Sequence, residues 1–282
     1  MTVILGAVAY DPKVVNIWEG FKLYFERRDV SFDYVLYSNY ERQVEALIDG
    51  VINVAWNSPL AWIRSRRLAQ ARGLSVQAIA MRDSDCDLTS VIVVRSDALI
   101  ANVADLKNRT VAVGAIDSPQ ATLIPLGYLR RNGLSPGADF SVQRHDVLCG
   151  KHGDHIGGER EAATALSSGT ADAACMIESN YALFQSEGLL QPGTTRVLAA
   201  TPLYDHCNLT AGPATDQLEH FRRLLLKMSY QDPEVRPLFD LEGLKAWREA
   251  RLQGYGELEA AVDELGFYDQ SGNIISADYP YR

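Results

Sequence analysis

The feature that most constrains how this chain folds is the alternation of short strand-like segments with longer helix-like ones. Apolar runs typical of buried strands fall at residues 3–9, 32–37, 52–56, 75–81, 90–95 and 110–113. Helical spacing of apolar residues is found between many of these runs, at residues 14–28, 40–49, 59–71 and 120–132. Strands separated by helices of this length form parallel β-α-β units, so the sequence predicts an α/β protein.

The C-terminal part of the chain departs from this alternation and is mainly helical in pattern. We expect helices at residues 216–229, 233–238, 244–250 and 255–265. No low-complexity or linker segment interrupts the chain. Two domains would therefore have to be joined by short crossing segments.

An internal repeat suggests that two such domains share one plan. Residues 46–55 read A-L-x-x-G-x-x-N-x-A, and residues 165–174 read A-L-x-x-G-x-x-D-x-A. Gly50 and Gly169 would each end a helix, and a short strand would follow. The match is either a coincidence within a common helix-turn-strand pattern or the sign of two similar lobes. Two lobes would hold a ligand between them, because pockets concentrate at domain interfaces and at the carboxyl ends of parallel strands.

Composition excludes several classes of protein. Hydrophobic residues make up 47% and charged residues 22% of the chain, which is typical of a globular protein rather than a disordered or fibrous one. The net charge of −9 repels a phosphate backbone and an anionic membrane surface, so we expect no nucleic-acid partner. The sequence has no apolar run of about 18 residues or more, so we expect no membrane insertion.

The N-terminus bears on where the protein works. Met1 and Thr2 lead directly into the first strand-like run, without a basic segment or a cleavage site. The sequence as printed therefore predicts a cytoplasmic protein, and a leader before Met1 would make it periplasmic. The four cysteines are far apart and form no C-x-x-C pair. In a reducing compartment we expect thiols or metal ligands rather than disulfides.

Common catalytic motifs are missing. The sequence contains no P-loop, no G-x-G-x-x-G, no H-E-x-x-H and no G-x-S-x-G. This excludes the most frequent nucleotide-binding, zinc-protease and hydrolase classes, but it leaves open an enzyme with a less familiar site.

Several segments resemble the type II periplasmic binding proteins. Residues 105–114, DLKNRTVAVG, resemble the start of the second lobe in that superfamily. Residues 117–125, DSPQATLIP, resemble D-S-T-S-G-x-x-x-P of its phosphonate/phosphate branch. Residues 158–174 resemble G-S-H-E-A-A followed by G-x-x-D-A-A, and residues 40–61 resemble a first-lobe motif that begins with tyrosine and ends with P-x-A. The resemblance covers roughly residues 1–215.

This resemblance implies a fold of two Rossmann-like lobes with a cleft between them. Residues 1–88 would form lobe 1, residues 89–203 lobe 2, and residues 204–282 would return to lobe 1 and add the C-terminal helices. The crossings would fall near residues 87–93 and 199–208. The implied function is capture of a small, anionic solute by lobe closure, with the membrane subunits of an ABC transporter as partners if the protein is exported.

An enzyme on the same scaffold is the alternative. Some relatives of this fold lack a leader and are cytoplasmic enzymes of menaquinone and thiamin-pyrimidine biosynthesis. The missing leader and the changed serine segment at residues 118–121 favour such an enzyme, whereas the breadth of the motif resemblance favours the binding protein.

In the matching branch, the serine-rich segment opens a helix and holds a tetrahedral anion with hydroxyl and backbone N–H groups. The corresponding residues here are Ser118, Pro119, Gln120, Ala121 and Thr122. Two hydroxyls and the glycine are replaced, while Ser118 keeps its hydroxyl and Gln120 can donate. The change favours a carboxylate or a flatter polar ligand over a phosphonate. A simple helix cap is the alternative interpretation.

Other ligand-binding candidates are predicted at strand ends and helix starts that face the cleft. They are Tyr10, Tyr40, Trp56, Asn57, Ser58, Ser90, Arg160 and Glu178. Arg160 stands where the branch has histidine, and a guanidinium offers a planar fork for a carboxylate or phosphate. Its alternative is a solvated charge paired with Glu159 or Glu161. Core packing is the alternative for Trp56, and helix capping for Asn57 and Ser58.

Cysteine and histidine residues form the last candidate set. Cys149, His152 and His155 could hold a metal in a glycine-rich loop, and thiolate with imidazole would suit zinc or iron. Their spacing matches no standard zinc motif. Cys207, His206 and Cys149 are the candidate catalytic residues of the enzyme alternative. Ordinary loop and core positions are the simpler interpretation, and a binding protein would need no cofactor.

Overall fold

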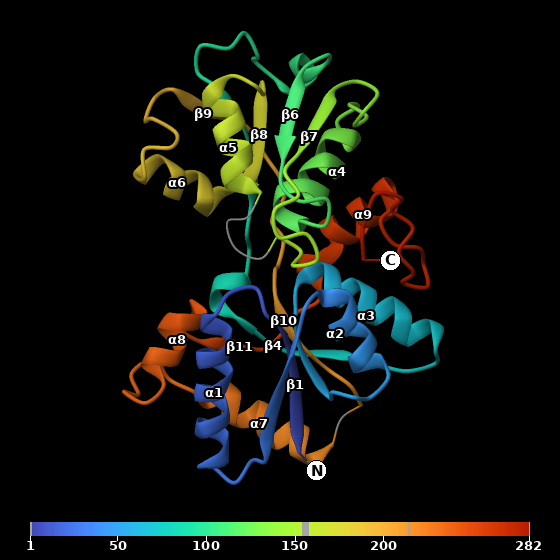
Figure 1. Ribbon diagram of the computed structural model, residues 1–282, viewed down its shortest axis with the longest axis vertical. Helices are drawn as coiled ribbons and strands as arrows, with labels where there is room; N and C mark the ends of the chain where they lie inside the picture. Colours follow the sequence, from blue (N-terminus) through green and yellow to red (C-terminus); the bar gives the residue numbers. More distant parts are fainter. Residues whose placement is uncertain (1, 154–157, 214, 282) are drawn as a thin grey trace.

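Two α/β lobes, one above the other in Figure 1, make up the computed structural model, which describes residues 2–153, 158–213 and 215–281. Each lobe has one mixed β-sheet with helices on both faces. None of the helices among these residues combines the length and the apolar composition that a membrane span requires.

Lobe 1 is built on a six-stranded sheet in the order β11-β4-β10-β3-β1-β2. Its strands are β1 (Val3–Val8), β2 (Phe32–Tyr37), β3 (Val54–Asn57), β4 (Gln77–Arg82), β10 (Asn208–Ala211) and β11 (Trp247–Arg248). β1 pairs in parallel with β2 and β3, whereas β10 runs antiparallel to β3 and β4. The carboxyl ends of β1, β2 and β3 therefore meet at one edge, which faces lobe 2.

Helices cover both faces of the lobe 1 sheet (Figure 1). They are α1 (Lys13–Glu26), α2 (Tyr40–Ile48), α3 (Pro59–Ala71), α7 (Asp216–Lys227) and α8 (Arg236–Glu242). On the face of α1, α7 and α8, a buried aromatic cluster forms the core, in which Phe25 packs against Phe32 and Phe221 at centroid distances of 5.3 and 4.7 Å. α2 and α3 cover the other face.

Lobe 2 has a five-stranded sheet in the order β7-β6-β8-β5-β9. Its strands are β5 (Ser90–Arg95), β6 (Thr110–Val113), β7 (Ser141–Arg144), β8 (Ala173–Ile177) and β9 (Thr195–Ala200). Its helices are α4 (Ile124–Arg131), α5 (Glu159–Ser168) and α6 (Glu178–Ser186). β5 runs antiparallel to β8 and β9, just as β10 does between its neighbours in lobe 1. Each sheet thus has an antiparallel strand, β10 or β5, between parallel strands, and β11 is a second antiparallel strand at the edge of lobe 1.

The internal repeat corresponds to equivalent positions in the two lobes. Gly50 and Gly169 both follow a helix with positive φ, +73° and +76°. Asn53 and Asp172 each precede a strand and make the same paired contact. The Asn53 backbone N–H donates to Ile4 O (3.1 Å) and its Oδ1 accepts from Ile4 N (2.9 Å). Asp172 makes this pair with Thr110, at 2.8 Å for both bonds. The repeat is therefore structural, and coincidence is the wrong interpretation.

Two crossing segments connect the lobes. One runs from β4 through the short helix η1 (Asp83–Asp85) to β5, and the other runs from β9 to β10. Leu88 and Tyr204 pair across them through N–H···O bonds of 2.8 and 2.9 Å. The His206 N–H also donates to Asp85 O at 2.8 Å. The crossings are thus held side by side, and they bring residues of both segments to the cleft.

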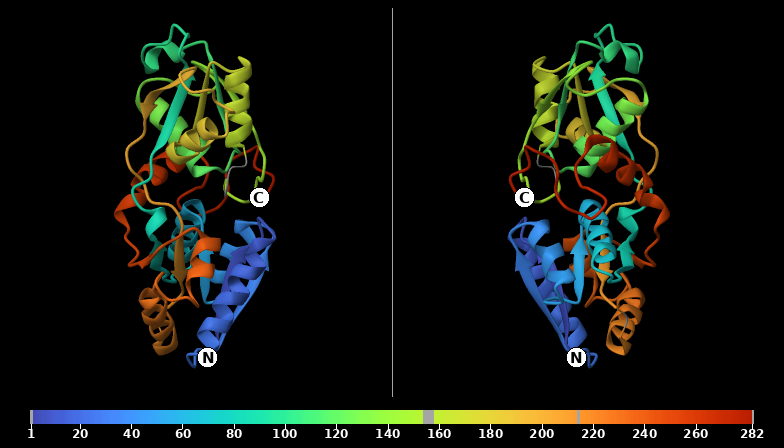
Figure 2. Two further views of the ribbon diagram at one scale, coloured as in Figure 1. Left: turned by 90° about the vertical axis from the view of Figure 1, so that its left-hand side faces the viewer. Right: turned by 90° about the vertical axis from the view of Figure 1, so that its right-hand side faces the viewer.

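The C-terminal helix α9 (Gly256–Leu265) lies beside the junction and contacts both lobes (Figures 1 and 2). Its carboxylates pair with arginines of α3, in Arg66–Glu259 at 2.7 Å and Arg67–Asp263 at 2.9 Å. On the other side, Arg131 of α4 pairs with Glu257 and Glu264. A buried cluster that includes residues of α3, α4 and α9 lies between these pairs. The C-terminal segment therefore bridges the lobes.

The prediction of a helix at residues 244–250 is wrong. α8 ends at Glu242, the following Gly243 has the left-handed conformation, and the chain then forms the short edge strand β11 against β4. Trp247 enters the lobe 1 core edge-on to Trp56, with centroids 5.6 Å apart. Burial of this indole against the sheet outweighs local helical spacing.

The helix expected at residues 120–132 begins instead with a π-helical turn, η3 (Pro119–Leu123), before α4.

Candidate functional site

Two adjoining cavities lie where the lobes and crossings meet. The first, of about 340 Å³, is lined by lobe 1 and the second crossing and includes Tyr10 and Trp56. The second, of about 360 Å³, lies between the lobes and includes Gln120 and Asn180 of lobe 2. Arg82, Ser84 and His206 line both cavities. We refer to the pair as the cleft cavities. A larger cavity of about 520 Å³ lies elsewhere, between lobe 2 and the C-terminal segment.

Arg82 lies at the boundary of the cleft cavities, but its charge is already compensated. Its Nε and Nη2 donate to the two oxygens of Asp85 at 2.6 and 2.9 Å, and its Nη1 donates to the backbone carbonyl of Glu242 at 2.7 Å. The Glu242 carboxylate is 3.4 Å away. Burial opposes the charged form, but the two carboxylates outweigh it and raise the pKa of Arg82. Burial likewise acts to raise the pKa of Asp85, but Arg82 and His206 lower it to about 2.

Lys13 supplies a second cation at the wall of the first cavity. Its Nζ donates to the backbone carbonyl of Leu241 at 3.3 Å and lies 6.0 Å from the centre of the Tyr10 ring. Within the part of the chain that the structure describes, no carboxylate lies within ion-pair distance of Lys13. This position, at the start of α1, thus presents an ammonium that a ligand could pair with.

Lobe 2 contributes the π-helical turn and the start of α6. Ser118 caps the turn, since its Oγ accepts from Ala121 N at 3.2 Å. Gln120 reaches into the second cavity, where its Oε1 lies 3.3 Å from His206 Nε2 and its Nε2 donates to Gly153 O at 2.7 Å. Asn180 donates to the buried Glu159 at 2.9 Å, and burial raises the pKa of Glu159 to about 7. This wall is polar and largely buried.

A loop of lobe 2, residues 149–153, extends to the strand ends of lobe 1. The Tyr40 N–H donates to Gly150 O at 3.1 Å, and the ring of Tyr40 stacks on His152 with centroids 4.7 Å apart. Lys151 donates to the backbone carbonyls of Ala9 and Ser38. A side chain at Gly153 would collide with Ser118. This loop therefore lies between the strand ends and Ser118, where the family resemblance predicts the ligand.

His152 joins Ser58 and Glu41 in a buried chain of hydrogen bonds. Its Nδ1 lies 2.6 Å from Ser58 Oγ, and its Nε2 lies 2.9 Å from Glu41 Oε1. The order resembles a hydrolytic triad, but all three side chains are at most 3% exposed, so a substrate could not reach Ser58. Ser58 also caps α3 through Ala61 N. The chain of bonds joins the two lobes.

Several other predicted residues lie in buried networks outside the cleft cavities. Asn57 bonds to Gln43, Ser65 and Thr210 within the lobe 1 core. Ser90 donates to Gln120 O at 2.6 Å and so supports the π-helical turn from below. Ala121 and Thr122 are buried in that turn, and Thr122 faces the larger cavity beside the C-terminal segment.

Arg160 and Glu178 lie on exposed surface. Arg160 pairs with Glu187 at 2.6 Å and lies over the Phe184 ring, 4.9 Å from its centre. Glu178 is exposed at the first position of α6. Neither residue lines the cleft cavities. The structure thus places Arg160 in a surface ion pair, with a glutamate other than the two that the sequence suggested.

The metal set predicted in the glycine-rich loop is only partly described, because His155 lies outside the described residues. Both ring nitrogens of His152 face Ser58 and Glu41, as above. Burial raises the pKa of Cys149 to about 12, which disfavours the free thiolate that a catalytic step requires. Within the described residues, the side chains that converge with metal-ligand spacing are instead Asp85, His206 and Cys207.

Sequence reasoning missed Lys13, Arg82, Asp85 and Asn180. Arg82 follows the expected strand at residues 75–81, so the rule that singled out Tyr10 and Asn57 at strand ends could have found it. Asn180 lies just after the end of β8, so the same rule could have found it. Lys13 and Asp85 carry no comparable signal, because their place depends on how the crossings and α8 pack.

Comparisons with known proteins agree with this architecture. A sequence model of the family described as "ABC transporter, phosphonate, periplasmic substrate-binding protein" matches residues 7–255. PhnD1 from Prochlorococcus marinus, solved with methylphosphonate, superposes with a TM-score of 0.69 at 17% identity, over 94% of this chain and 98% of that one. A Xanthomonas citri protein solved with ATP superposes with a TM-score of 0.73 at 14% identity, over 94% of this chain and 98% of that one. The aliphatic sulphonate-binding protein SsuA from Escherichia coli superposes with a TM-score of 0.52 at 21% identity, over 93% of this chain and 82% of that one.

Proposed function

This chain belongs to the periplasmic substrate-binding proteins of phosphonate-type ABC transporters, and we propose that it binds a small oxyanion in the cleft cavities. The family supports a substrate-binding protein over the cytoplasmic-enzyme alternative. The observation that carries the proposed ligand class is Lys13. Its ammonium lines the first cavity with a carbonyl partner but no ion-pair partner within the described residues.

The size and lining of the cavities support a small polar ligand. Volumes of about 340 and 360 Å³ lie at the lower end of the range for small-molecule sites. Trp56 and Tyr10 give the first cavity an aromatic wall, and Gln120 and Asn180 bring polar groups from lobe 2 to the second. A ligand here would touch both lobes and the crossings, so its binding would favour the closed arrangement.

The ligand need not be a phosphonate. Ser118 lies behind the loop of residues 149–153, which occupies the space beside the π-helical turn. Relatives of this fold differ in ligand, since structures with methylphosphonate and with ATP both superpose on this chain. We include small carboxylates and sulfonates with phosphonates in the proposed class, because an ammonium pairs with any of these anions.

The proposal extends to location and partners. Proteins of this family work in the periplasm and deliver ligand to the membrane subunits of an ABC transporter. We extend this location and these partners to the present protein. The membrane subunits would contact the surfaces of the two lobes in the closed state.

Isothermal titration calorimetry with methylphosphonate, phosphate, acetate and methanesulfonate tests the ligand class. At least one should bind saturably, and Lys13→Gln should weaken it by about 10-fold or more, since hydrogen bonds to charged groups contribute about 1.5–3 kcal/mol. Lys22→Gln is the matched control on the same helix, because Lys22 already pairs with Asp33 at 3.1 Å. No saturable binding, or equal effects of the two substitutions, would overturn the proposal.

A further inference from the structure

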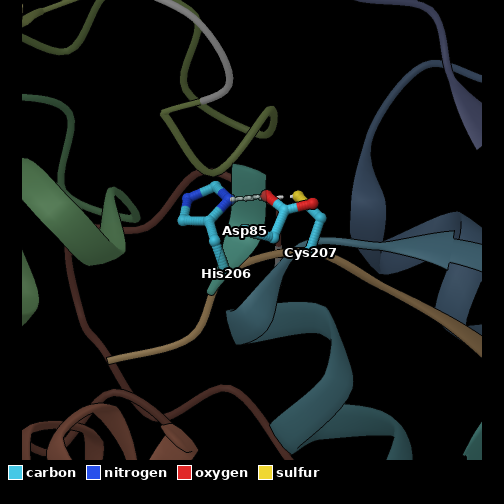
Figure 3. Close-up of side chains that lie close together, drawn as sticks. All are labelled: Asp85, His206 and Cys207. Carbon is cyan, nitrogen blue, oxygen red and sulfur yellow. Dashed lines mark hydrogen bonds and ion pairs between the residues drawn. The ribbon is translucent and has the colours of Figure 1, made fainter. Parts of the chain in front are cut away.

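Three potential metal ligands lie close together (Figure 3), and they line the cleft cavities. Asp85 comes from the first crossing, and His206 and Cys207 come from the second. One ligand atom from each lies within 4.8 Å of the other two, and all three side chains are buried. Asp85 and His206 line the second cavity, and His206 and Cys207 line the first. A group bound at this point would therefore be open to both cavities.

The arrangement around His206 differs from that of a catalytic triad. His206 Nδ1 lies 3.1 Å from Cys207 Sγ and 3.6 Å from Asp85 Oδ1. In a nucleophile–histidine–acid triad, the nucleophile and the acid lie on opposite ring nitrogens. Here both face the same nitrogen, so the three atoms surround one point in space, as ligands of a single ion would.

We propose that Asp85, His206 and Cys207 bind one zinc ion whose fourth position opens into the cleft cavities. Imidazole, thiolate and carboxylate are all zinc ligands, and three protein ligands with one open position are typical of zinc sites that take an exogenous ligand. Metal–ligand bonds of about 2.0–2.3 Å at tetrahedral angles place ligand atoms about 3.3–3.8 Å apart. The distances of 3.1 and 3.6 Å around His206 Nδ1 are close to this requirement.

Neighbouring residues provide the outer support that such a site needs. A metal-bound histidine usually donates its other N–H to an oxygen, and His206 Nε2 lies 3.3 Å from Gln120 Oε1. A ligating carboxylate is usually hydrogen-bonded as well, and Asp85 accepts from Arg82 at 2.6 and 2.9 Å. Gln120 and Arg82 would thus orient the two ligands from outside.

Charge explains what the ion would add to ligand binding. A divalent ion would balance the Asp85 carboxylate and a Cys207 thiolate, while Arg82 and Glu242 oppose each other at 3.4 Å. The thiol proton of Cys207 would leave to solvent as the metal–sulfur bond forms. An oxyanion completing the coordination would then have a cation between the two cavities, in addition to Lys13. This last step rests on the proposed function, whereas the metal site does not.

Titration of the purified protein with Zn²⁺ and Co²⁺, without any anion, tests the site. One equivalent should bind, and cobalt should give the visible bands of a four-coordinate site with a thiolate-to-metal absorption. Cys207→Ser should remove that absorption and weaken zinc binding by more than about 100-fold, beyond the effect of losing an outer partner. Gln120→Leu should weaken it by about 10–100-fold. Cys86→Ser is the matched control, because Cys86 follows Asp85 directly but lies outside the set of converging ligands.

Alkylation of the wild-type thiols gives a second readout that does not depend on how a variant folds. Zinc should slow the modification of Cys207 and leave that of Cys86 unchanged. Absence of stoichiometric metal, or metal binding that survives Cys207→Ser, would overturn the zinc site. Anion binding that is unaffected by a chelator would reject the site as part of ligand binding while leaving the proposed function in place. Metal binding without any anion binding would reject the proposed function while leaving the zinc site in place.

Discussion

His152 of lobe 2 and Ser58 of lobe 1 share a hydrogen bond between the lobes, with Nδ1 and Oγ 2.6 Å apart and both side chains fully buried. The same imidazole bonds to Glu41 and stacks on Tyr40. The loop that carries it therefore fastens lobe 2 to the strand ends of lobe 1. The lobes cannot separate without breaking these contacts.

His152→Ala should loosen the lobes. The change removes both bonds and leaves the buried Glu41 without this partner, which costs several kcal/mol in comparable buried pairs. We expect a larger radius of gyration by small-angle X-ray scattering and a lower midpoint of thermal unfolding. His220→Ala, on the partly exposed face of α7, should change neither. An unchanged radius would show that α9 and the crossings alone hold the lobes together.

Asp117 should make stability fall as pH rises. Its Oδ2 accepts from Gly150 N at 2.6 Å, His152 N at 3.3 Å and Tyr279 at 3.3 Å. Burial raises the pKa of Asp117 from 3.8 to about 6, against the opposing effect of His152 and with a further increase from Glu41. Below pH 3.8, Asp117 is protonated in both the folded and the unfolded state. Above about pH 6 both are ionised, and the folded state bears a cost of about 3 kcal/mol.

Asp117→Asn tests this linkage, because the amide oxygen can still accept these bonds while the charge is gone. Between pH 5 and pH 8, the free energy of unfolding of the wild type should fall by about 1–2 kcal/mol more than that of the variant, as measured by urea denaturation. Asp97→Asn, at a largely exposed carboxylate, is the control. Parallel pH profiles for wild type and Asp117→Asn would contradict the raised pKa.

Arg82→Gln should be strongly destabilising. The substitution removes the Arg82 guanidinium from Asp85 and Glu242, both buried, and breaking a buried pair in this way costs about 3–5 kcal/mol. Chemical denaturation measures this loss. Arg95→Gln breaks an exposed pair with Asp97 and should cost less than about 1 kcal/mol. Similar losses for both would mean that the Arg82 network contributes no more than a surface pair.

Arg160→Ala should leave ligand affinity unchanged within about 0.5 kcal/mol. Its guanidinium pairs with Glu187, and both side chains are about 40% exposed, at 40% and 38%. Exposed pairs of this kind contribute about 0–1 kcal/mol, and here to stability rather than to binding. Calorimetry with whichever anion binds wild type is the measurement. A loss comparable to that of Lys13→Gln would place Arg160 in the ligand site of a different lobe arrangement.

Much of the fold could be read from local pattern. The repeat around Gly50 and Gly169 predicted two lobes because a left-handed glycine that ends a helix and a polar residue before the next strand are local features. The resemblance of residues 117–125 pointed to the family for a similar reason, since short motifs reflect local backbone geometry. Local pattern failed at residues 244–250, where burial of Trp247 against the sheet determined the structure.

The sequence by itself determined the β-α-β order, the two lobes and the family, because these follow from periodicity, glycine position and motif order along neighbouring residues. Only the tertiary structure decided which side chains meet in the cleft. Ser58 and His152 are 94 residues apart, and Glu41 and His152 are 111 apart. Asp85 and His206 meet only because the two crossings pair. Such contacts depend on how distant segments dock, and that docking is set by the packing of buried surface, which no local pattern encodes.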